Sequence, residues 1–365
     1  MKVKTAIVML NLGGPQNLQA VGPFLRNLFA DREIIPLPAQ SVLGPLLARL
    51  RTRRVQENYR AIGGGSPLLH WTEIQGRGLV AWLDRLSPET APHQFYVAFR
   101  YVEPYSEDAL RRMQADGVQR AVAFTQYPHF SCATTGSSLN ELWRAAQRLG
   151  LENAFRWSVI DRWHNHPGFI AAMARAVRAG LAQYAEDVRD EVVLLFSAHS
   201  LPLSIINRGD PYPAEIGASV QAVMEQLGFS HRYLLSYQSS VGPVQWLGPS
   251  TETMIARLGA RGHKHVLVVP IAFTSDHIET LSEIDREYGE LAHRVGITHF
   301  KRAPALNGDE GFQRALADIV YSHLRNGEIC SRQYRLHCPG CANSQCRQIL
   351  NPAGGASAWG APAAA

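Results

Sequence analysis

The 365-residue sequence has no long apolar run, because no stretch reaches the roughly 18 residues that a membrane-spanning helix needs. It also lacks a leader pattern: the first residues, MKVKTAIVML, lead directly into a strand and resemble neither a cleavable signal nor a transit peptide. Its five cysteines are few and odd in number, which argues against a disulfide framework and for metal or redox use of the thiols. We therefore expect an intracellular, cytoplasmic protein.

A concentrated basic block is also missing, although the formal net charge is +5. The positive balance favours an anionic partner, such as a carboxylate-bearing substrate or a phospholipid surface, but without such a block nucleic acid is not expected. Two glycine-rich loops, NLGGP (residues 11–15) and IGGGSP (residues 62–67), lack the spacing of a dinucleotide fingerprint and the lysine of a phosphate loop. No nucleotide is therefore expected, and the loops serve as turns or let backbone approach a flat ligand.

The sequence does contain a regular alternation of apolar, β-branched runs with amphipathic helical patterns. Eight candidate strands are spread over the chain: residues 5–12, 94–101, 120–127, 155–161, 192–199, 233–239, 265–273 and 298–305. This order predicts an α/β fold with two Rossmann-like domains, each a four-stranded parallel β-sheet flanked by helices, and an active-site cleft between them. The domains are expected at residues 1–165 and 166–330.

An acidic stretch follows the seventh of these runs, in KHVLVVPIAFTSDHIETLSEIDREYGEL (residues 264–291). The first ten residues predict a buried strand, and Asp276 with Glu279 predicts a capping box that starts a helix. At helical spacing four carboxylates share one face, at the end of a strand where open α/β sheets bind ligands: Asp276, Glu279, Glu283 and Glu287. Such a face holds protons or cations, or it is simply solvated. His277 falls on the apolar side of an ideal α-helix, so a position before the regular helix or a π-type widening is needed to turn it toward the acids.

Residues 37–55, LPAQSVLGPLLARLRTRRV, are apolar at first and end in clustered arginines. Such a segment suits a lip on a membrane surface, with apolar side chains against acyl chains and arginines against headgroups. The residues concerned are Val42, Leu43, Leu46, Leu47 and Leu50, followed by Arg49, Arg51, Arg53 and Arg54. An ordinary amphipathic core helix explains the pattern equally well.

Three of the cysteines, Cys338, Cys341 and Cys346, form a C-x2-C-x4-C pattern beside a Pro-Gly turn. Thiolates this close are suited to a soft metal, but three ligands are one short of a closed site. His337 could complete a zinc site, or a distant cysteine could complete an iron–sulfur cluster. The residues alone rank zinc first.

Several long motifs together resemble the ferrochelatase family. In chain order they are YRAIGGGSPL (59–68), FTQYPHFSCATTGSSLNELW (124–143), LLFSAHSLP (194–202), NRGDPYP (207–213), YQSSVGPVQWLGPSTE (237–252) and IAFTSDHIETLSEID (271–285). The similarity extends to Arg347 and is closer to the mitochondrial and proteobacterial enzymes that use protoporphyrin IX. It implies two Rossmann-like domains and the insertion of Fe²⁺ into protoporphyrin IX, the terminal step of haem biosynthesis.

The resemblance also implies which residues act in catalysis. His199, in SAHSLP, and Glu279 would contact the iron, and imidazole is both an Fe²⁺ ligand and a base near neutral pH. His277, Asp276, Glu279 and Glu283 would form a polar chain for protons or incoming metal. Two further positions, His166 and Asp318, align with residues that are sometimes assigned catalytic roles in the family.

For the porphyrin, the resemblance implies apolar walls from Leu12, Trp246 and Phe273. Its propionates would be anchored by hydroxyl or charge-assisted hydrogen bonds from Arg51, Tyr59, Ser66, Arg100 and Tyr101. The family also decides the choice of metal at the cysteines, because SCATTGSSLN resembles the segment that supplies a fourth cluster ligand. A [2Fe–2S] cluster is thus expected on Cys132, Cys338, Cys341 and Cys346, with Cys330 left as a free thiol.

These expectations place a cluster-binding extension at residues 331–350 and a disordered tail at residues 351–365, which is low in complexity. We expect peripheral association with the inner face of the cell membrane, and the oligomeric state is left open, a homodimer being one option. A chelatase for another tetrapyrrole or metal, such as coproporphyrin or cobalt, is the nearest alternative activity. A porphyrin- or iron-binding module and an electron-transfer protein are rivals from other classes.

Overall fold

The computed structural model describes residues 3–34, 37, 39–242, 244–336, 338–341 and 343–350. The expected disordered tail and His337 lie outside these residues. The described chain contains two four-stranded sheets, and every paired strand runs parallel to its neighbours. All eight strands predicted from apolar runs are present, which confirms the fold class.

The first sheet has the strand order β2-β1-β3-β4, and the second has the order β6-β5-β7-β8. The strands are β1 (Thr5–Asn11), β2 (His93–Phe99), β3 (Arg120–Thr125), β4 (Arg156–Ile160), β5 (Val193–His199), β6 (Tyr233–Gln238), β7 (His265–Pro270) and β8 (His299–Arg302). In each sheet one of the central strands, β1 and β7 respectively, is buried at every position, as expected for parallel strands covered on both faces.

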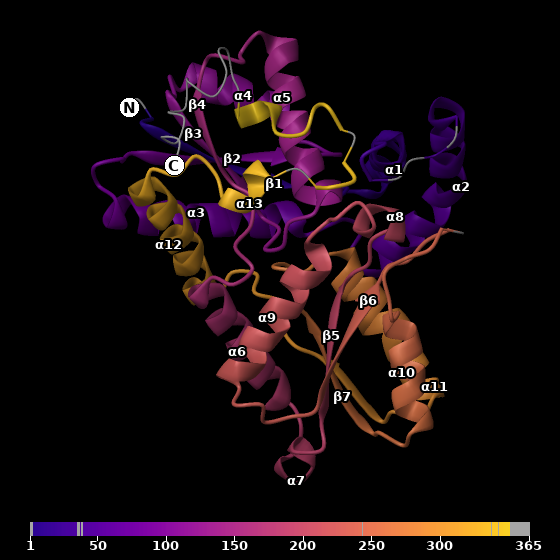
Figure 1. Cartoon of the computed structure of the whole chain (residues 1–365). Helices are drawn as coiled ribbons and strands as arrows, with labels where there is room; N and C mark the ends of the chain where they lie inside the picture. The colour runs from indigo at the N-terminus through magenta and orange to yellow at the C-terminus, as the bar shows by residue number, and fades with distance from the viewer. Residues whose placement is uncertain are drawn as a thin grey trace.

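Helices cover both faces of each sheet (Figure 1). They are η1 (Leu18–Ala20), α1 (Val21–Ala30), α2 (Gln40–Ala61), α3 (Leu68–Leu86), α4 (Ser106–Ala115), η2 (Cys132–Gly136), α5 (Ser137–Leu149), α6 (Pro167–Leu181), α7 (Glu186–Arg189), α8 (Leu203–Ile206), α9 (Tyr212–Gln226), α10 (Thr251–Ala260), η3 (Glu279–Tyr288), α11 (Gly289–Arg294), α12 (Glu310–Asn326), α13 (Arg332–Arg335) and η4 (Gln348–Leu350). Within the described residues no helix is both long and apolar enough to cross a bilayer.

The two halves share one hydrophobic core. A single group of buried side chains includes Ile7 and Phe124 from the first sheet together with Leu194, Phe196 and Leu267 from the second. In addition, α12 of the second half packs along α3 of the first, so the chain crosses back at its end (Figure 1). The predicted division near residue 165 falls between β4 and α6, and buried side chains from both sides of it pack together.

The acidic helix begins differently from the prediction. The capping box is wrong, because η3 starts at Glu279, the N-cap position before it is Ile278 with helical backbone angles, and no side chain caps the helix. Instead Thr280 Oγ1 donates to Asp276 Oδ1 at 3.0 Å, which organises the turn before the helix. The whole of η3 is a π-helix, which is a rare form associated with functional sites.

The glycine-rich loops pack against each other. A Cβ atom on Gly14 would lie 2.4 Å from Ser66 Oγ, and one on Gly65 would lie 2.2 Å from the carbonyl oxygen of Gln16. The backbone approach that these glycines permit is therefore between the two loops. It places Ser66 and Tyr59 next to the end of β1, because the Tyr59 hydroxyl lies 3.7 Å from the same Gly14 position.

Candidate active site

His199 is the last residue of β5 and is partly exposed at the carboxyl edge of the second sheet. Its Nδ1 lies 2.6 Å from the Ser200 carbonyl oxygen, and because a carbonyl only accepts, Nδ1 carries the proton in the neutral ring. The Tyr212 hydroxyl donates to the His199 carbonyl oxygen at 3.0 Å and so holds the backbone. His199 Nε2 therefore keeps its lone pair and is able to accept a proton or bind a metal.

The π-helix brings acidic residues to the same edge. Gln238 in β6 is the register partner of His199, and its amide nitrogen donates to the Glu279 carbonyl oxygen at 3.1 Å. His277 lies just before η3, and its Nε2 is 3.3 Å from Glu279 Oε2. The expectation that His277 stands outside a regular helix, beside a π-type widening, is confirmed. One edge of the sheet thus carries two histidines and a carboxylate.

Glu283 is saturated with hydrogen bonds. Its Oε2 accepts from the side chains of Gln238, at 3.0 Å, and Ser239, while its Oε1 accepts from the Ser239 backbone N–H and the Tyr288 hydroxyl, both at 2.8 Å. Four donors match the four lone-pair directions of a carboxylate. Ser239 makes these bonds from a left-handed backbone conformation, with φ of +66°. Glu283 therefore holds η3 to the end of β6, which the sequence pattern did not indicate.

Asp276 is also engaged by neighbouring side chains, and its place in the expected polar chain stays a prediction. Its carboxylate accepts from Thr280 Oγ1 and Asn307 Nδ2, at 3.0 and 2.8 Å, and lies 3.0 Å from Arg302 Nη1. These contacts make it a support for the turn before η3. Glu287, at the outer end of the helix, is exposed, and burial followed by the charge of Glu283 raises its pKa. The carboxylates that share one face of the helix thus extend from the edge of the sheet to the protein surface.

The other half contributes two tyrosines near Glu279. Tyr59 is 2% exposed, and burial, followed by the charge of Glu279, raises its pKa well above the usual value. Burial likewise raises the pKa of Tyr127, and Glu279 adds to this effect. Both phenols are therefore neutral hydroxyls that lie within electrostatic reach of the carboxylate. Tyr127 was not among the predicted site residues, although its place at the end of a predicted strand was a usable signal.

The predicted apolar walls are partly exposed side chains. Leu12 follows β1 and packs on the core of the first half, and the Phe273 ring contacts the His277 ring in a tilted arrangement with centroids 4.7 Å apart. Trp246 is partly exposed, and its indole N–H donates to the Val241 carbonyl oxygen at 2.9 Å. Leu12 and Phe273 thus place apolar surface next to the polar groups that surround Glu279.

The predicted propionate anchors divide into two groups. Arg51 is half-buried over the Phe29 ring, at 6.0 Å, and no ion pair of Arg51 is present among the described residues. Burial, followed by the charge of Arg54, lowers its pKa, so an anionic ligand beside Arg51 would be favoured. Ser66 is partly exposed beside Gly14 and remains a candidate with Tyr59.

Arg100 and Tyr101 have partners within the protein, and their direct anchoring role stays a prediction. The Tyr101 hydroxyl donates to Asp31 Oδ2 at 2.7 Å, and the side chain is buried. Arg100 Nη2 donates to the same Asp31 oxygen at 3.0 Å, and its Nη1 lies 3.6 Å from Glu141. Both side chains therefore belong to a buried ionic network, because Asp31 already neutralises the guanidinium.

His166 and Asp318 are brought together although they are far apart in the sequence. Burial lowers the pKa of His166, and the charge of Asp318 opposes this shift. His166 Nδ1 is buried and has no hydrogen-bond partner among the described residues. Their catalytic role stays a prediction.

The four predicted cluster cysteines also lie near one another. Burial raises the pKa of the Cys132 thiol, and the charges of Asp210, Cys338 and Cys341 raise it further. Burial raises the pKa of Cys346 to about 11. The charge of Arg347 opposes this shift, and the charges of Cys341 and Cys338 add to it. Within the described residues, however, no group of three or more His, Cys, Asp or Glu side chains has an arrangement that would hold a metal ion. Cys330 is buried in the core of the first half.

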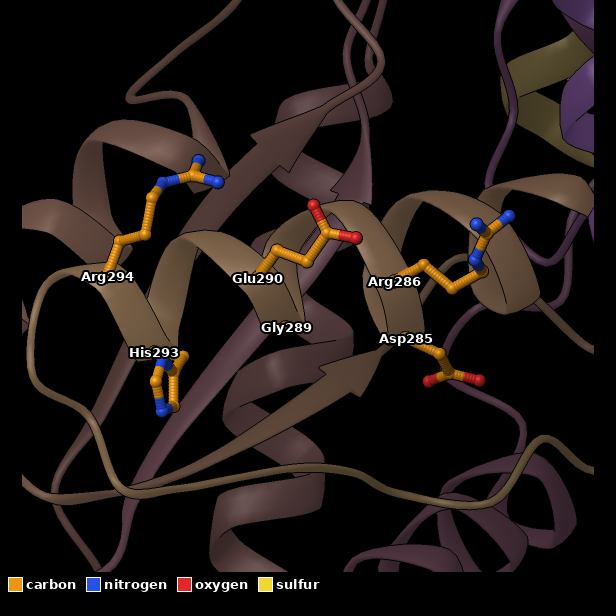
Figure 2. A pocket seen from close by; sticks show the side chains of 6 residues that line it. All are labelled: Asp285, Arg286, Gly289, Glu290, His293 and Arg294. Carbon is orange, nitrogen blue, oxygen red and sulfur yellow. The ribbon is translucent and has the colours of Figure 1, made fainter.

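The outer face of η3 and α11 carries a shallow hollow of about 510 Å³ (Figure 2). It is lined by Asp285, Arg286, Gly289, Glu290, His293 and Arg294. Asp285 is already bound by Arg302, through two bonds of 2.7 and 2.9 Å. None of the predicted site residues lines this hollow.

Known proteins resemble this chain along nearly its whole length. A family model described as ferrochelatase matches residues 4–324. The mitochondrial ferrochelatase of Xenopus laevis is 55% identical over 346 residues, which cover 94% of this chain and 84% of that protein. The human enzyme is 52% identical over 348 residues, covering 95% and 82%, and the Schizosaccharomyces pombe enzyme is 50% identical over 351 residues, covering 96% and 83%. Among solved structures, SirB from Bacillus subtilis with Fe³⁺ has a TM-score of 0.51 at 12% identity, covering 89% and 98%, and so shares the fold.

Proposed function

The chain belongs to the ferrochelatase family, and from this premise we propose how its own residues insert ferrous iron into protoporphyrin IX. The enzyme acts in the terminal step of haem synthesis. The observation that carries our assignment is that Gln238, the register partner of His199, donates to the backbone of Glu279, so that His199 and the His277–Glu279 pair belong to one edge of the second sheet. That edge is where parallel sheets bind their ligands.

Metal insertion removes two protons from pyrrole nitrogens and strips water from the incoming ion. We assign His199 Nε2 as the base that takes a pyrrole proton, because Nδ1 is committed to the Ser200 carbonyl oxygen. Glu279 supplies an oxygen ligand to the substrate iron or receives a proton, and His277, at 3.3 Å, exchanges protons with it. Glu283 stays outside the proton path, since both its oxygens are occupied.

For the porphyrin, we assign Leu12 and Phe273 as apolar walls and Trp246 as a flanking residue. Arg51 is the cation for one propionate, supported by its half-buried position and by the absence of an ion pair within the described part of the chain. Tyr59 and Ser66 supply hydroxyl donors beside it. Arg100 and Tyr101 support this wall indirectly through Asp31.

We further propose that the four cysteines hold a [2Fe–2S] cluster. The donor set fits, because iron–sulfur clusters are bound by thiolates, and the raised pKa values of Cys132, Cys338 and Cys346 mean that bound metal would displace their protons. The terminal segment 331–350 is already tied to the first half: Ser331 Oγ donates to Asp161 at 2.9 Å, and Trp143 Nε1 donates to Gln348 at 2.9 Å. When bound, the cluster would crosslink these segments.

Membrane association is a proposal with a structural basis in α2. Its exposed apolar residues are Val42, at 66%, Leu46, at 50%, and Leu50, at 68% exposure. These positions are four residues apart and form one stripe, flanked by exposed Arg49, Arg53 and Arg54. Leu43 and Leu47 are partly buried instead, and Leu47 packs on the core, so the predicted lip contains three apolar contacts rather than five. The relatives are named as mitochondrial, and nothing here supports the cytoplasmic placement expected from the sequence.

The assignment is tested by turnover of purified protein under anaerobic conditions, with Fe²⁺ or Co²⁺ and either protoporphyrin IX or coproporphyrin. We expect the highest kcat/KM with Fe²⁺ and protoporphyrin IX. His199→Ala should reduce kcat by more than about 100-fold while porphyrin binding persists, since it removes a base and little wall area. His231→Ala is the control, because His231 precedes β6 at the opposite edge of the same sheet. Porphyrin binding without product in the wild-type protein would instead favour a carrier.

A further inference from the structure

A buried amide lies between the two groups of catalytic residues. Gln238 is 1% exposed at the carboxyl end of β6 and is the register partner of His199. Its Oε1 accepts from the Ser197 hydroxyl at 2.7 Å, and its Nε2 donates to the Glu279 carbonyl oxygen and to Glu283 Oε2, at 3.1 and 3.0 Å. The amide has only this orientation, because both oxygens that face Nε2 are acceptors.

The backbone of the same residue supports His199. The Ser200 N–H donates to the Gln238 carbonyl oxygen at 2.8 Å. The Ser200 carbonyl oxygen is in turn the partner of His199 Nδ1, at 2.6 Å. Gln238 is therefore linked, through Ser200, to the carbonyl oxygen that sets the orientation of the His199 ring. Through its side chain it contacts the first residue of the π-helix.

Buried hydroxyl groups hold the Oε1 side of this amide in place. Ser197 Oγ lies 2.8 Å from Thr251 Oγ1, which lies 2.9 Å from Ser236 Oγ, and all three residues have no exposed surface. Such a network is rigid when every member is bonded. On the Nε2 side, Gln238 shares Glu283 with Ser239, whose backbone lies in the left-handed region. The arrangement fixes η3 relative to β6 at one point.

We propose that Gln238 is a positioning residue that sets the placement of Glu279 opposite His199, by donating from one amide to the first turn of η3 and to Glu283. The proposal rests on the roles proposed above for His199 and Glu279. Without this donor, the first turn of η3 is free to shift relative to β6. Misplacement of a catalytic group by about 1 Å costs on the order of 100-fold in rate, so a loss of roughly 10- to 100-fold in kcat is expected. Porphyrin binding should change little, because the walls and Arg51 are elsewhere.

Two variants separate hydrogen-bond donation from packing. Gln238→Met keeps the length of the side chain and removes the donor. Gln238→Glu keeps the shape but places a carboxylate oxygen against the Glu279 carbonyl and Glu283. The titratable groups that face this position are Glu279, Glu283 and Tyr288 on η3 and His199 on β5. As pH falls, two facing carboxylates share a proton, which restores a donor.

The measurement is kcat and the KM for Fe²⁺ from about pH 6 to 9, with porphyrin affinity and thermal unfolding recorded for each variant. The ratio of kcat between Gln238→Glu and wild type should rise as pH falls, and the ratio for Gln238→Met should be low and flat. The matched control is Gln221→Glu, because Gln221 is an exposed residue of α9 whose Nε2 also donates to a glutamate, Glu225, at 2.9 Å. Its ratio should stay near one.

Wild-type kcat and iron KM in Gln238→Met would overturn the proposal. So would a ratio near one for Gln238→Glu over the whole pH range, even if the Met variant failed to fold, because loss of the donor to η3 would then have no effect. Failure of the wild-type protein to make haem, by contrast, would refute the proposed function itself. This outcome is seen before any variant is compared.

Discussion

The exposed stripe on α2 allows a quantitative test of membrane binding. In the double variant Leu46→Asp/Leu50→Asp, two side chains that are 50% and 68% exposed lose their apolar surface. Complete burial of a leucine is worth about 1.5–3 kcal/mol, so at these exposed fractions the pair contributes about 2–3.5 kcal/mol to insertion. That loss corresponds to a weakening of roughly 30- to 300-fold in vesicle affinity. The folded protein should be unaffected, because neither side chain packs on the core.

The assay is sedimentation with anionic phospholipid vesicles at low and high salt, where the arginines of α2 make wild-type binding salt-sensitive. A closely matched control is Phe229→Asp/Leu336→Asp, which makes the same charge change at side chains that are 50% and 69% exposed but lie outside α2. The control should bind vesicles nearly as wild type does. Equal binding by wild type and the α2 variant, with the control unchanged, would refute the lip assignment.

Three further predictions concern other parts of the molecule. Glu279→Gln preserves shape but cannot accept a proton at neutral pH, so turnover should collapse; a change confined to the KM for Fe²⁺ would make Glu279 a metal guide only. Cys132→Ser should lose the visible absorbance and acid-labile sulfide of purified protein while Cys330→Ser keeps both, and stoichiometric zinc without sulfide would contradict the cluster. Burial of His323 lowers its pKa from 6.5 to about 4. As pH falls below 6.5 the unfolded chain therefore binds a proton that the folded chain does not bind until about pH 4, and the free energy of unfolding decreases over this range. His323→Leu should therefore gain about 3 kcal/mol over wild type in free energy of unfolding between pH 7 and pH 4, measured by denaturant titration, and no gain would show that the imidazole is not held neutral.

Much of the architecture was predictable because it depends on local patterns. Each parallel strand is a short apolar run that needs burial on both faces, so eight such runs between helical patterns indicate two α/β sheets. The position of His199 followed from the same logic, since it ends one of these runs. The resemblance to a family then supplied the expected roles of residues that have no local signature, such as Cys132, and these roles stay predictions.

The sequence alone could not decide where several predicted side chains point or which partners they have. Leu43 and Leu46 look alike in the sequence, yet only Leu46 is exposed, because the packing of α1 on α2 selects the buried face. Arg100 reads as a free cation until the fold brings Asp31, 69 residues away, to within 3.0 Å. These outcomes depend on contacts between residues that are distant in sequence.

The π-helix shows the same division between sequence and tertiary structure. From spacing alone, the sequence determined that acids and His277 follow a buried strand, and that an ideal α-helix would turn His277 away from them. Only the tertiary structure decided that the helix is widened and that Glu283 serves to hold it. The physical reason is that the donors to Glu283 include Gln238 and Ser239, which come from a neighbouring strand end some 45 residues earlier in the chain.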